Sequence, residues 1–284
     1  MALVPMSRLL EQATKGGYAV GAFNTNNLEI VQGIVEAADE LESPVILQAS
    51  QGAIKYAGLD YIVAIVKAAS EQVKIPVALH LDHGTSFEQA VQCIRAGFSA
   101  VMYDGSKHSF EENIAKTLEV VRVAKPIGVT VEAELGKIGG AEDDITVSDR
   151  DASMTDPDEA KEFVQRTGVD ALAVAIGTAH GPYKGEPRLD FERLQKIRNV
   201  VEIPLVLHGA SGVPEEAIRK AIGIGISKIN IDTDLRQAFT AAVVKVLTEK
   251  PSEFDPRKLL GPAREALKQV VKEKINLFGS AGRA

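Results

Sequence analysis

The feature that most constrains this sequence is a strand-plus-helix unit that recurs along the chain. Short apolar runs begin at positions 19, 44, 76, 99, 128, 171, 204 and 226, so successive runs start 22 to 43 residues apart. A strand, a crossover helix and two short loops need this spacing when neighbouring strands are parallel. Eight such units in a row predict an α/β fold, a closed (β/α)8 TIM barrel, rather than a doubly wound open sheet.

The segments between the runs have the periodicity of amphipathic helices. The segment 26–43 is expected to turn one apolar side inward, formed by Leu28, Ile30, Val31, Ile34, Val35 and Ala38. An Asp-Pro pair at Asp156 marks a helix start and Gly168 marks its end. The tail 254–278 is also helical in pattern. We therefore expect residues 1–284 to form one barrel domain with additional C-terminal helices.

The longest interval, between the fifth and sixth runs, contains the segment 136–157. This segment is rich in glycine and then in acidic residues, and it has little apolar content. It is too long for a simple connection between a strand and a helix. The sequence predicts a mobile loop over one end of the barrel.

Composition excludes several classes of function. The net charge of -7 and the pI near 5.4 argue against a sequence-independent grip on nucleic acid, which needs a positive surface. The single cysteine, Cys93, allows no intrachain disulfide, as is usual in the cytoplasm. No apolar run approaches the roughly 18 residues that span a bilayer, and the N-terminus lacks a signal-peptide pattern. We expect a cytoplasmic protein without nucleic-acid or membrane partners.

Polar residues gather at the ends of the eight runs. In a (β/α)8 barrel the carboxyl ends of all strands meet at one face, where catalysis takes place. The residues expected to share this face are Asn24, Ser50, Asp82, His83, Asp104, Glu132, Glu134, His180, His208, Asn230 and Asp232.

Three of these residues are histidines: His83, His180 and His208. Three imidazoles that converge on one cavity suit a borderline cation such as zinc, with one coordination position left open. Any one of them alone is better explained as a hydrogen-bonded histidine at a strand end. Their coincidence on one face favours the metal interpretation.

Asp82 directly precedes His83, and strand alternation predicts that the two side chains point to opposite sides. Asp82 is therefore expected to exchange a proton with a substrate oxygen near the cation rather than to bind the cation. The alternative is that its carboxylate orients a histidine ring.

Four other polar residues lie near the predicted site. Two of them have two possible roles each, and the other two are expected to support the site. Asp104 and Glu134 lie on adjacent predicted strands, where they would hold a second cation or a displaced position of the first, or form salt bridges. His80 and Glu132 lie deeper in their strands, and we expect both to support the site through hydrogen bonds.

The loops after the seventh and eighth runs are typical of phosphate sites. The sequences HGASG (208–212) and NIDTD (230–234) leave small residues and free backbone N–H groups where a helix begins. Gly181, Gly209 and Ser211 would let a phosphate approach the backbone closely. Glycine-rich loops alone are weak indications, because turns need glycine in any case.

A set of motifs spread over the whole chain resembles the class II, zinc-dependent ketose-bisphosphate aldolases. The motifs are LHLDHG (79–84), VEAELG (131–136), GGAEDD (139–144), GTAHGPYKGEP (177–187), VLHGASG (206–212) and KINIDTDLR (228–236). The resemblance runs from about residue 17 to the tail and leaves no motif out. The family comprises aldolases for fructose 1,6-bisphosphate and tagatose 1,6-bisphosphate.

The resemblance implies a role for each matching residue. Zinc would be bound by His83, His180 and His208, with Asp104 and Glu134 as a second metal position. Asp82 would transfer the proton of the C4 hydroxyl, and Glu142 the proton at the dihydroxyacetone phosphate carbon. The ketose phosphate end would be surrounded by Gly181, Gly209, Ala210, Ser211, Asn230, Ile231, Asp232 and Thr233. Ser50 and Arg257 would hold the far phosphate, the arginine reaching in from a neighbouring subunit.

The implied reaction is reversible cleavage of fructose 1,6-bisphosphate into dihydroxyacetone phosphate and glyceraldehyde 3-phosphate, a step of glycolysis and gluconeogenesis. A zinc-stabilised enediolate would be the intermediate. Tagatose 1,6-bisphosphate differs only at C4 and is the alternative substrate, although the tail at 255–268 is similar to that of glycolytic members. The resemblance also implies a monovalent cation, Na⁺ or K⁺, and a homodimer or homotetramer.

Three competing interpretations have their own signals. A Schiff-base aldolase would use Lys228 as the nucleophile, but it has no need of three histidines at the rim. A metal-dependent hydrolase of the common barrel type has paired histidines on its first strand, where this chain has AFNTNN (22–27). A non-catalytic sugar-phosphate-binding subunit would not need the acid, the metal ligands and the long loop together.

Overall fold

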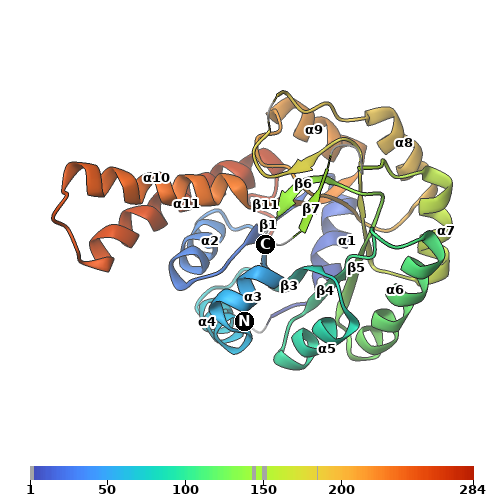
Figure 1. Ribbon diagram of the computed structural model, residues 1–284, viewed down its shortest axis with the longest axis horizontal. Coiled ribbons are helices and arrows are strands. Elements are labelled where there is room, and N and C mark those ends of the chain that lie inside the picture. The colour runs from blue at the N-terminus through green and yellow to red at the C-terminus, as the bar shows by residue number, and fades with distance from the viewer. Residues whose placement is uncertain (1–2, 143–144, 149–151, 184) are drawn as a thin grey trace.

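In the computed structural model, which describes residues 3–142, 145–148, 152–183 and 185–284, eight parallel strands close into a barrel (Figure 1). They adjoin in the order β1-β11-β10-β8-β5-β4-β3-β2, so each lies beside its neighbour in the chain and the last closes on the first. The predicted fold is confirmed. The barrel strands are β1 (Val20–Asn24), β2 (Val45–Ser50), β3 (Val77–Gly84), β4 (Ala100–Tyr103), β5 (Thr130–Leu135), β8 (Ala171–Val174), β10 (Leu205–Leu207) and β11 (Ile226–Ile231).

Helices cover the outside of the barrel, so both faces of each strand are buried, as parallel sheets require. Side-chain caps fix where several helices begin: Asn27, Ser50, Ser86 and Ser109 each accept a backbone N–H of the first turn. The covering helices are α2 (Leu28–Glu40), α3 (Gln51–Ala57), α4 (Leu59–Glu71), α5 (Phe87–Ala96), α6 (Phe110–Ala124) with the 3₁₀ turn η1 (Lys125–Ile127), α7 (Pro157–Thr167), α8 (Phe191–Val200) and α9 (Glu215–Ile224).

The predicted helix boundaries at two places can be compared with the structure. Helix α7 begins after Asp156, whose side chain accepts two backbone N–H groups, and it ends at Gly168, as predicted. Helix α2 buries the predicted apolar side with one exception. Leu28, at the first position of α2, is 47% exposed, so it lies outside the buried side.

An N-terminal helix, α1 (Met6–Gly16), closes one end of the barrel. Its buried residues Met6, Leu9 and Leu10 belong to an apolar cluster with interior residues of the strands, among them Ala78 and Ala100. Small side chains on the strands leave room for the larger side chains of the helix. The lower half of the barrel is therefore a dry core, and polar residues are left to the opposite half.

The two C-terminal helices, α10 (Thr233–Glu249) and α11 (Pro256–Phe278), extend side by side beyond the barrel (Figure 1). Helix α11 returns to the barrel and packs against α2, where Leu267, Val271 and Ile275 are fully buried. The additional C-terminal helices are therefore confirmed. Among the residues described above, no helix combines the length and the apolar character needed to cross a membrane.

The sixth apolar run, 171–181, differs from the prediction. It divides into the barrel strand β8 and a two-residue strand, β9 (Ala179–His180), which belongs to a separate three-stranded sheet. In that sheet β9 pairs with β6 (Gly139–Glu142), which forms a hairpin with β7 (Ile145–Val147). The long segment 136–157, which we expected to be a mobile loop, thus contains strands that place it beside His180.

The packing of α1 predicts a stability effect at a position far from the polar half of the barrel. Leu10→Ala should lower the free energy of unfolding by about 2–5 kcal/mol, because Leu10 is fully buried and the strands cannot close over the resulting cavity. Chemical denaturation measures the change, with Leu28→Ala at a half-exposed position as the control. Equal stability of the two variants would contradict the role of α1 as part of the core.

Candidate metal centre

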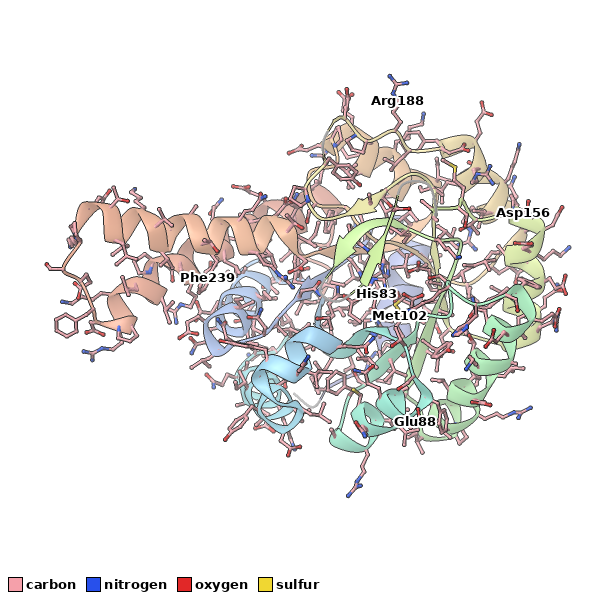
Figure 2. All side chains as sticks on the ribbon, in the orientation of Figure 1. His83, Glu88, Met102, Asp156, Arg188 and Phe239 are labelled. Carbon is pink, nitrogen blue, oxygen red and sulfur yellow. The ribbon has the colours of Figure 1, made fainter. Side chains whose placement is uncertain are left out.

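The inward-facing side chains of the barrel form layers. Above the apolar layer of α1 lies a fully buried polar layer made of Gln48, His80, Glu132 and Lys228, together with Met102. Register pairs such as Gln48 with His80 and Met102 with Glu132 place these residues at one level. The layer above contains Asn24, Asp82, His83, Asp104, Glu134, His208 and Asn230, each at most 7% exposed. His83 lies near the middle of the barrel in Figure 2, whereas Glu88, Asp156 and Arg188 lie at its periphery.

The three predicted histidines converge. The ring centroid of His83 lies 4.9 Å from that of His180 and 4.7 Å from that of His208, and the last two are 5.9 Å apart. One nitrogen of each ring lies within 4.8 Å of a nitrogen of the other two. They come from β3, from β9 and from the residue after β10, which are distant in sequence. The sequence therefore correctly predicted that these rings share one site.

The backbone at His83 departs from the predicted strand geometry. Its φ is +47°, a left-handed conformation that is strained for a residue other than glycine, and the pairing of β3 with β4 shifts register between Leu81 and Gly84. The amide of Gln51 donates to the carbonyl oxygen of His83 at 2.6 Å and supports this turn. The prediction that Asp82 and His83 point to opposite sides was wrong, because the turn directs both side chains into the barrel mouth.

Hydrogen bonds fix which nitrogen carries a proton in two of the rings, those of His83 and His208. His83 Nδ1 lies 3.0 Å from Asp104 Oδ2, and His208 Nε2 lies 2.8 Å from Glu132 Oε1. Both carboxylates act as acceptors, so these nitrogens are donors. The remaining nitrogens, His83 Nε2 and His208 Nδ1, face each other at 2.9 Å. Two lone pairs at this distance repel, so a positive charge, either a proton or a metal cation, must lie between them.

The pKa values of His180 and His208 favour neutral imidazoles, the form that binds metals. Burial and the nearby charge of His83 lower the pKa of His180 to about 3. Burial, with the same charge and that of Lys228, holds the pKa of His208 well below its usual value. Metal binding at this site would displace the proton held between His83 and His208.

Two carboxylates stand beside His83. Glu134 Oε2 is buried and has no hydrogen-bond partner among the described residues, and burial followed by the charge of Asp104 raises the pKa of Glu134 well above its usual value. Burial alone would raise the pKa of Asp104, but hydrogen bonds from His83 and Ser106 lower it. His83, Asp104 and Glu134 offer a second group of ligand atoms, each within 4.8 Å of the others. The partnerless oxygen and the imidazole donors together fit a divalent cation.

Asp82 lies in the same layer but in neither group of potential ligands. Three amides hold its carboxylate: Asn24 and Gln48 donate to Oδ2 at 3.0 Å each, and Asn230 donates to Oδ1 at 3.2 Å. Gln48 also donates to the side-chain oxygen of Asn24 at 2.6 Å. These donors hold the carboxylate of Asp82 in a fixed orientation, as the group that accepts a proton requires.

A cavity of about 640 Å³ opens beside His180 and continues along α10. Its walls include most of the residues predicted to surround a phosphate: Gly181, Gly209, Ala210, Ser211, Asn230, Asp232 and Thr233, beside His180. Ile231 is different, since its side chain is 1% exposed and packs in the apolar core. The cavity has the size of a small-molecule site.

Two predicted residues lie elsewhere, and the side chain of a third is not described. Ser50 is buried, caps α3 and does not line this cavity. Arg257 lies at the start of α11, with its side chain 89% exposed and paired with Asp255, so within one chain it does not reach the cavity. Glu142 ends β6, but its side chain lies outside the described residues.

Two residues that the sequence did not single out contribute to the site. The hydroxyl of Tyr183 accepts from the backbone N–H of Ala179 and donates to the carbonyl of Gly209, both at 2.8 Å, so it joins the loops that carry His180 and His208. Arg236, one turn into α10, lines the cavity and pairs with Asp232. Both belong to motifs quoted above, but nothing in the sequence indicated these contacts.

Glycine is required at two positions where the backbone closely approaches β9: Gly140 on β6 and Gly209 after β10. A side chain at Gly140 would overlap the carbonyl oxygen of His180, and a Cβ at Gly209 would lie 2.5 Å from that of Ala179. Both glycines have positive φ, +97° and +61°. The close approach brings the backbone after His208 against the strand of His180.

The chain matches a family model described as "Fructose-bisphosphate aldolase class-II" over residues 4–283. It is 51% identical to a fructose-bisphosphate aldolase of Thermus caldophilus, over 99% of this chain and all of that one. It is 47% identical to a sulfofructosephosphate aldolase of Alkalicoccus urumqiensis, over 100% and 99% of the two chains. The crystal structure of the YdjI aldolase from Escherichia coli K12 aligns with a TM-score of 0.88 at 38% identity, covering 99% of both chains.

The Tyr183 bridge predicts a loss of both stability and metal affinity. Tyr183→Phe should lower the free energy of unfolding by about 1–3 kcal/mol, because it leaves the amide of Ala179 and the carbonyl of Gly209 without their partner. Zinc affinity should fall by about tenfold, as for other groups that orient metal ligands. Thermal unfolding and zinc competition measure the two effects, and Tyr56→Phe, 78% exposed, should change neither. Unchanged zinc affinity would remove Tyr183 from the site.

Proposed function

This chain belongs to the class-II fructose-bisphosphate aldolase family, and we propose that its histidine-lined cavity cleaves fructose 1,6-bisphosphate between C3 and C4. The products are dihydroxyacetone phosphate and glyceraldehyde 3-phosphate, and the reaction is reversible. The observation that carries the proposal is the pair of opposed imidazole nitrogens, His83 Nε2 and His208 Nδ1, in contact with His180, which lines a cavity walled by small residues. Tagatose 1,6-bisphosphate is not favoured, because the full-length relatives are named for fructose bisphosphate.

His83, His180 and His208 would hold the catalytic divalent cation, which we propose to be Zn²⁺ because imidazole nitrogens suit it. When bound, the cation supplies a Lewis acid that withdraws electrons from the ketose carbonyl. Asp104 and Glu134 would serve a second position beside His83. In the arrangement described here Asp104 also orients the His83 ring, a role that metal-binding histidines usually require of a carboxylate.

Asp82 is the proposed proton acceptor for the cleavage step. Its carboxylate takes the proton of the C4 hydroxyl, the C4–O bond becomes a carbonyl, and the C3–C4 bond breaks. The electron pair of that bond stays on the three-carbon fragment at C3, which must then receive a proton. Asn24, Gln48 and Asn230 keep Asp82 in place throughout. The proposed donor to C3 is Glu142, from the hairpin segment beside His180.

The residues that line the cavity would bind one phosphate through backbone N–H groups: Gly181, Gly209, Ala210, Ser211, Asp232 and Thr233. Ile231, whose side chain packs in the core, would contribute its backbone N–H alone. Asn230 also lines the cavity and would lie near the reacting carbon, since it donates to Asp82. A monovalent cation, Na⁺ or K⁺, is part of the proposal on the family resemblance alone.

For the far phosphate we add Arg236 to the proposed binding groups. Among the described residues that line the cavity, Arg236 is the one that carries a guanidinium group. Arg257 of a neighbouring subunit, together with Ser50, is also proposed to bind the far phosphate.

Self-association and compartment complete the proposal. Val244 and Leu247 on α10 are exposed, as is Phe254 in the connection to α11, the last at 89%. A second copy of the chain would cover them in a homodimer or homotetramer. Cys93 is 1% exposed, and burial raises its pKa to about 12, so its thiol stays protonated and inert. This is in keeping with a cytoplasmic enzyme.

Metal removal tests the proposed function. After exhaustive chelation, cleavage of fructose 1,6-bisphosphate should fall to the rate in buffer alone, and added zinc should restore it, while the tagatose epimer should be cleaved more slowly throughout.

Asp82→Ala should lower kcat by about 10²–10⁴-fold while zinc affinity stays close to that of the wild type. Coupled detection of triose phosphate measures both. Equal rates before and after chelation, or trapping of a borohydride adduct on Lys228, would contradict the mechanism.

The two arginines can be distinguished by matched substitutions. Arg236→Met should raise KM for fructose 1,6-bisphosphate by about 10- to 100-fold, because a charged hydrogen bond to a phosphate contributes roughly 1.5–3 kcal/mol. The value of kcat should change little, since the phosphate is bound equally in substrate and transition state. If Arg257→Met raises KM and Arg236→Met does not, the far phosphate is bound by the arm of a neighbouring subunit.

A further inference from the structure

The buried layer under the metal centre contains a lysine that the proposed mechanism does not use. Lys228 is 0% exposed, and its Nζ lies 2.8 Å from Glu132 Oε2. The other oxygen of Glu132, Oε1, lies 2.8 Å from His208 Nε2. Lys228, Glu132 and His208 therefore form a continuous hydrogen-bonded chain from β11 through β5 to the residue after β10.

The order of donors and acceptors along this chain is fixed from the lysine end. An ammonium group can only donate, so Glu132 must accept at Oε2. A carboxylate that accepts from a cation at one oxygen is also the acceptor at the other, so His208 must donate from Nε2. The lone pair of His208 is then on Nδ1, the atom that faces His83 Nε2 at 2.9 Å.

The second histidine–carboxylate pair has no such cation. Asp104 accepts from His83 and from the backbone N–H of Ser106, and no Lys or Arg pairs with it among the described residues. Asp104 also belongs to a group of potential metal ligands with Glu134, whereas Glu132 belongs to none. The two carboxylates therefore differ in their partner. Glu132 is paired with Lys228 and is not a potential metal ligand, whereas Asp104 has no such lysine and is available to a cation.

We propose that Lys228 is a positioning residue for the metal centre, which through Glu132 holds His208 in the tautomer that presents Nδ1 to the cation. This inference rests on the proposed metal site but not on the reaction performed there. It assigns Lys228 a role in zinc binding, in place of the nucleophile that a Schiff-base mechanism would need.

A positioning role for Lys228 and a purely structural role lead to opposite changes in zinc affinity when Lys228→Met is added to Glu132→Gln. In Glu132→Gln, Lys228 still requires an acceptor and takes the amide oxygen, so the amide NH₂ faces His208 and forces its proton onto Nδ1. In the double variant Lys228→Met/Glu132→Gln, no ammonium group needs an acceptor. The amide oxygen of the introduced glutamine can then accept from His208 Nε2 again. The double variant should therefore bind zinc more tightly than the single Glu132→Gln variant, although it carries one more buried substitution.

The experiment measures zinc affinity by competition with a chromophoric chelator, together with the ¹⁵N shifts of the His208 ring in metal-free protein. Lys228→Met should raise the zinc dissociation constant by about 10- to 100-fold, as for other groups that orient metal ligands. Glu132→Gln should move the ring proton of His208 from Nε2 to Nδ1, and the double variant should return it. Circular dichroism and thermal unfolding of each metal-free variant establish that it is folded.

Two control variants separate the inference from general perturbation. Met102→Leu changes packing in the same buried layer without touching a hydrogen bond, and Lys245→Met removes a lysine that is exposed on α10; both should bind zinc as the wild type does. Wild-type zinc affinity in Lys228→Met, or a double variant no better than Glu132→Gln, would overturn the inference. Failure of the wild type to bind zinc would instead refute the proposed function.

Discussion

The site depends on one electrostatic constraint: two imidazole nitrogens that both carry lone pairs are held 2.9 Å apart in a buried barrel mouth. Isolated in water, such rings would turn away from each other. Here each is fixed by a carboxylate on its other nitrogen, Asp104 for His83 and Glu132 for His208. The repulsion is removed only by positive charge between them, so the two rings have a geometry that fits a cation before any cation binds.

The sequence predicted the barrel and the shared rim because both follow from repetition. Eight apolar runs, each separated from the next by enough residues for a crossover helix, leave few other arrangements. Parallel strands then bring their carboxyl ends to one face whatever lies between them. This is why His83 and His208, 125 positions apart, could be placed together without coordinates. The supporting roles of Glu132 and the capping of α7 by Asp156 likewise follow from local rules.

Other parts of the site could not be predicted because they arise where regular geometry is broken. The positive φ of His83 overrides strand alternation, and no local pattern distinguishes it from a regular strand. His180 reaches the site on β9, in a small sheet that exists only because the long segment folds back over the mouth. Arg236 and Tyr183 act through contacts whose partners lie on other elements, and such contacts leave no trace in spacing along the chain.

The case of Lys228 shows that depth along a strand, not residue type, decides which chemistry a side chain can perform. Lys228 and Asn230 point the same way from β11, but two residues advance a strand by roughly 6.6 Å, one layer of the interior. Asn230 lines the cavity and reaches Asp82, whereas Lys228 is fully buried against Glu132. A Schiff-base nucleophile must be a neutral amine and must reach the substrate. Lys228 meets neither requirement, because it is paired with Glu132 and lies one layer below the cavity. The same lysine moved up by one layer would compete with the metal site instead of supporting it.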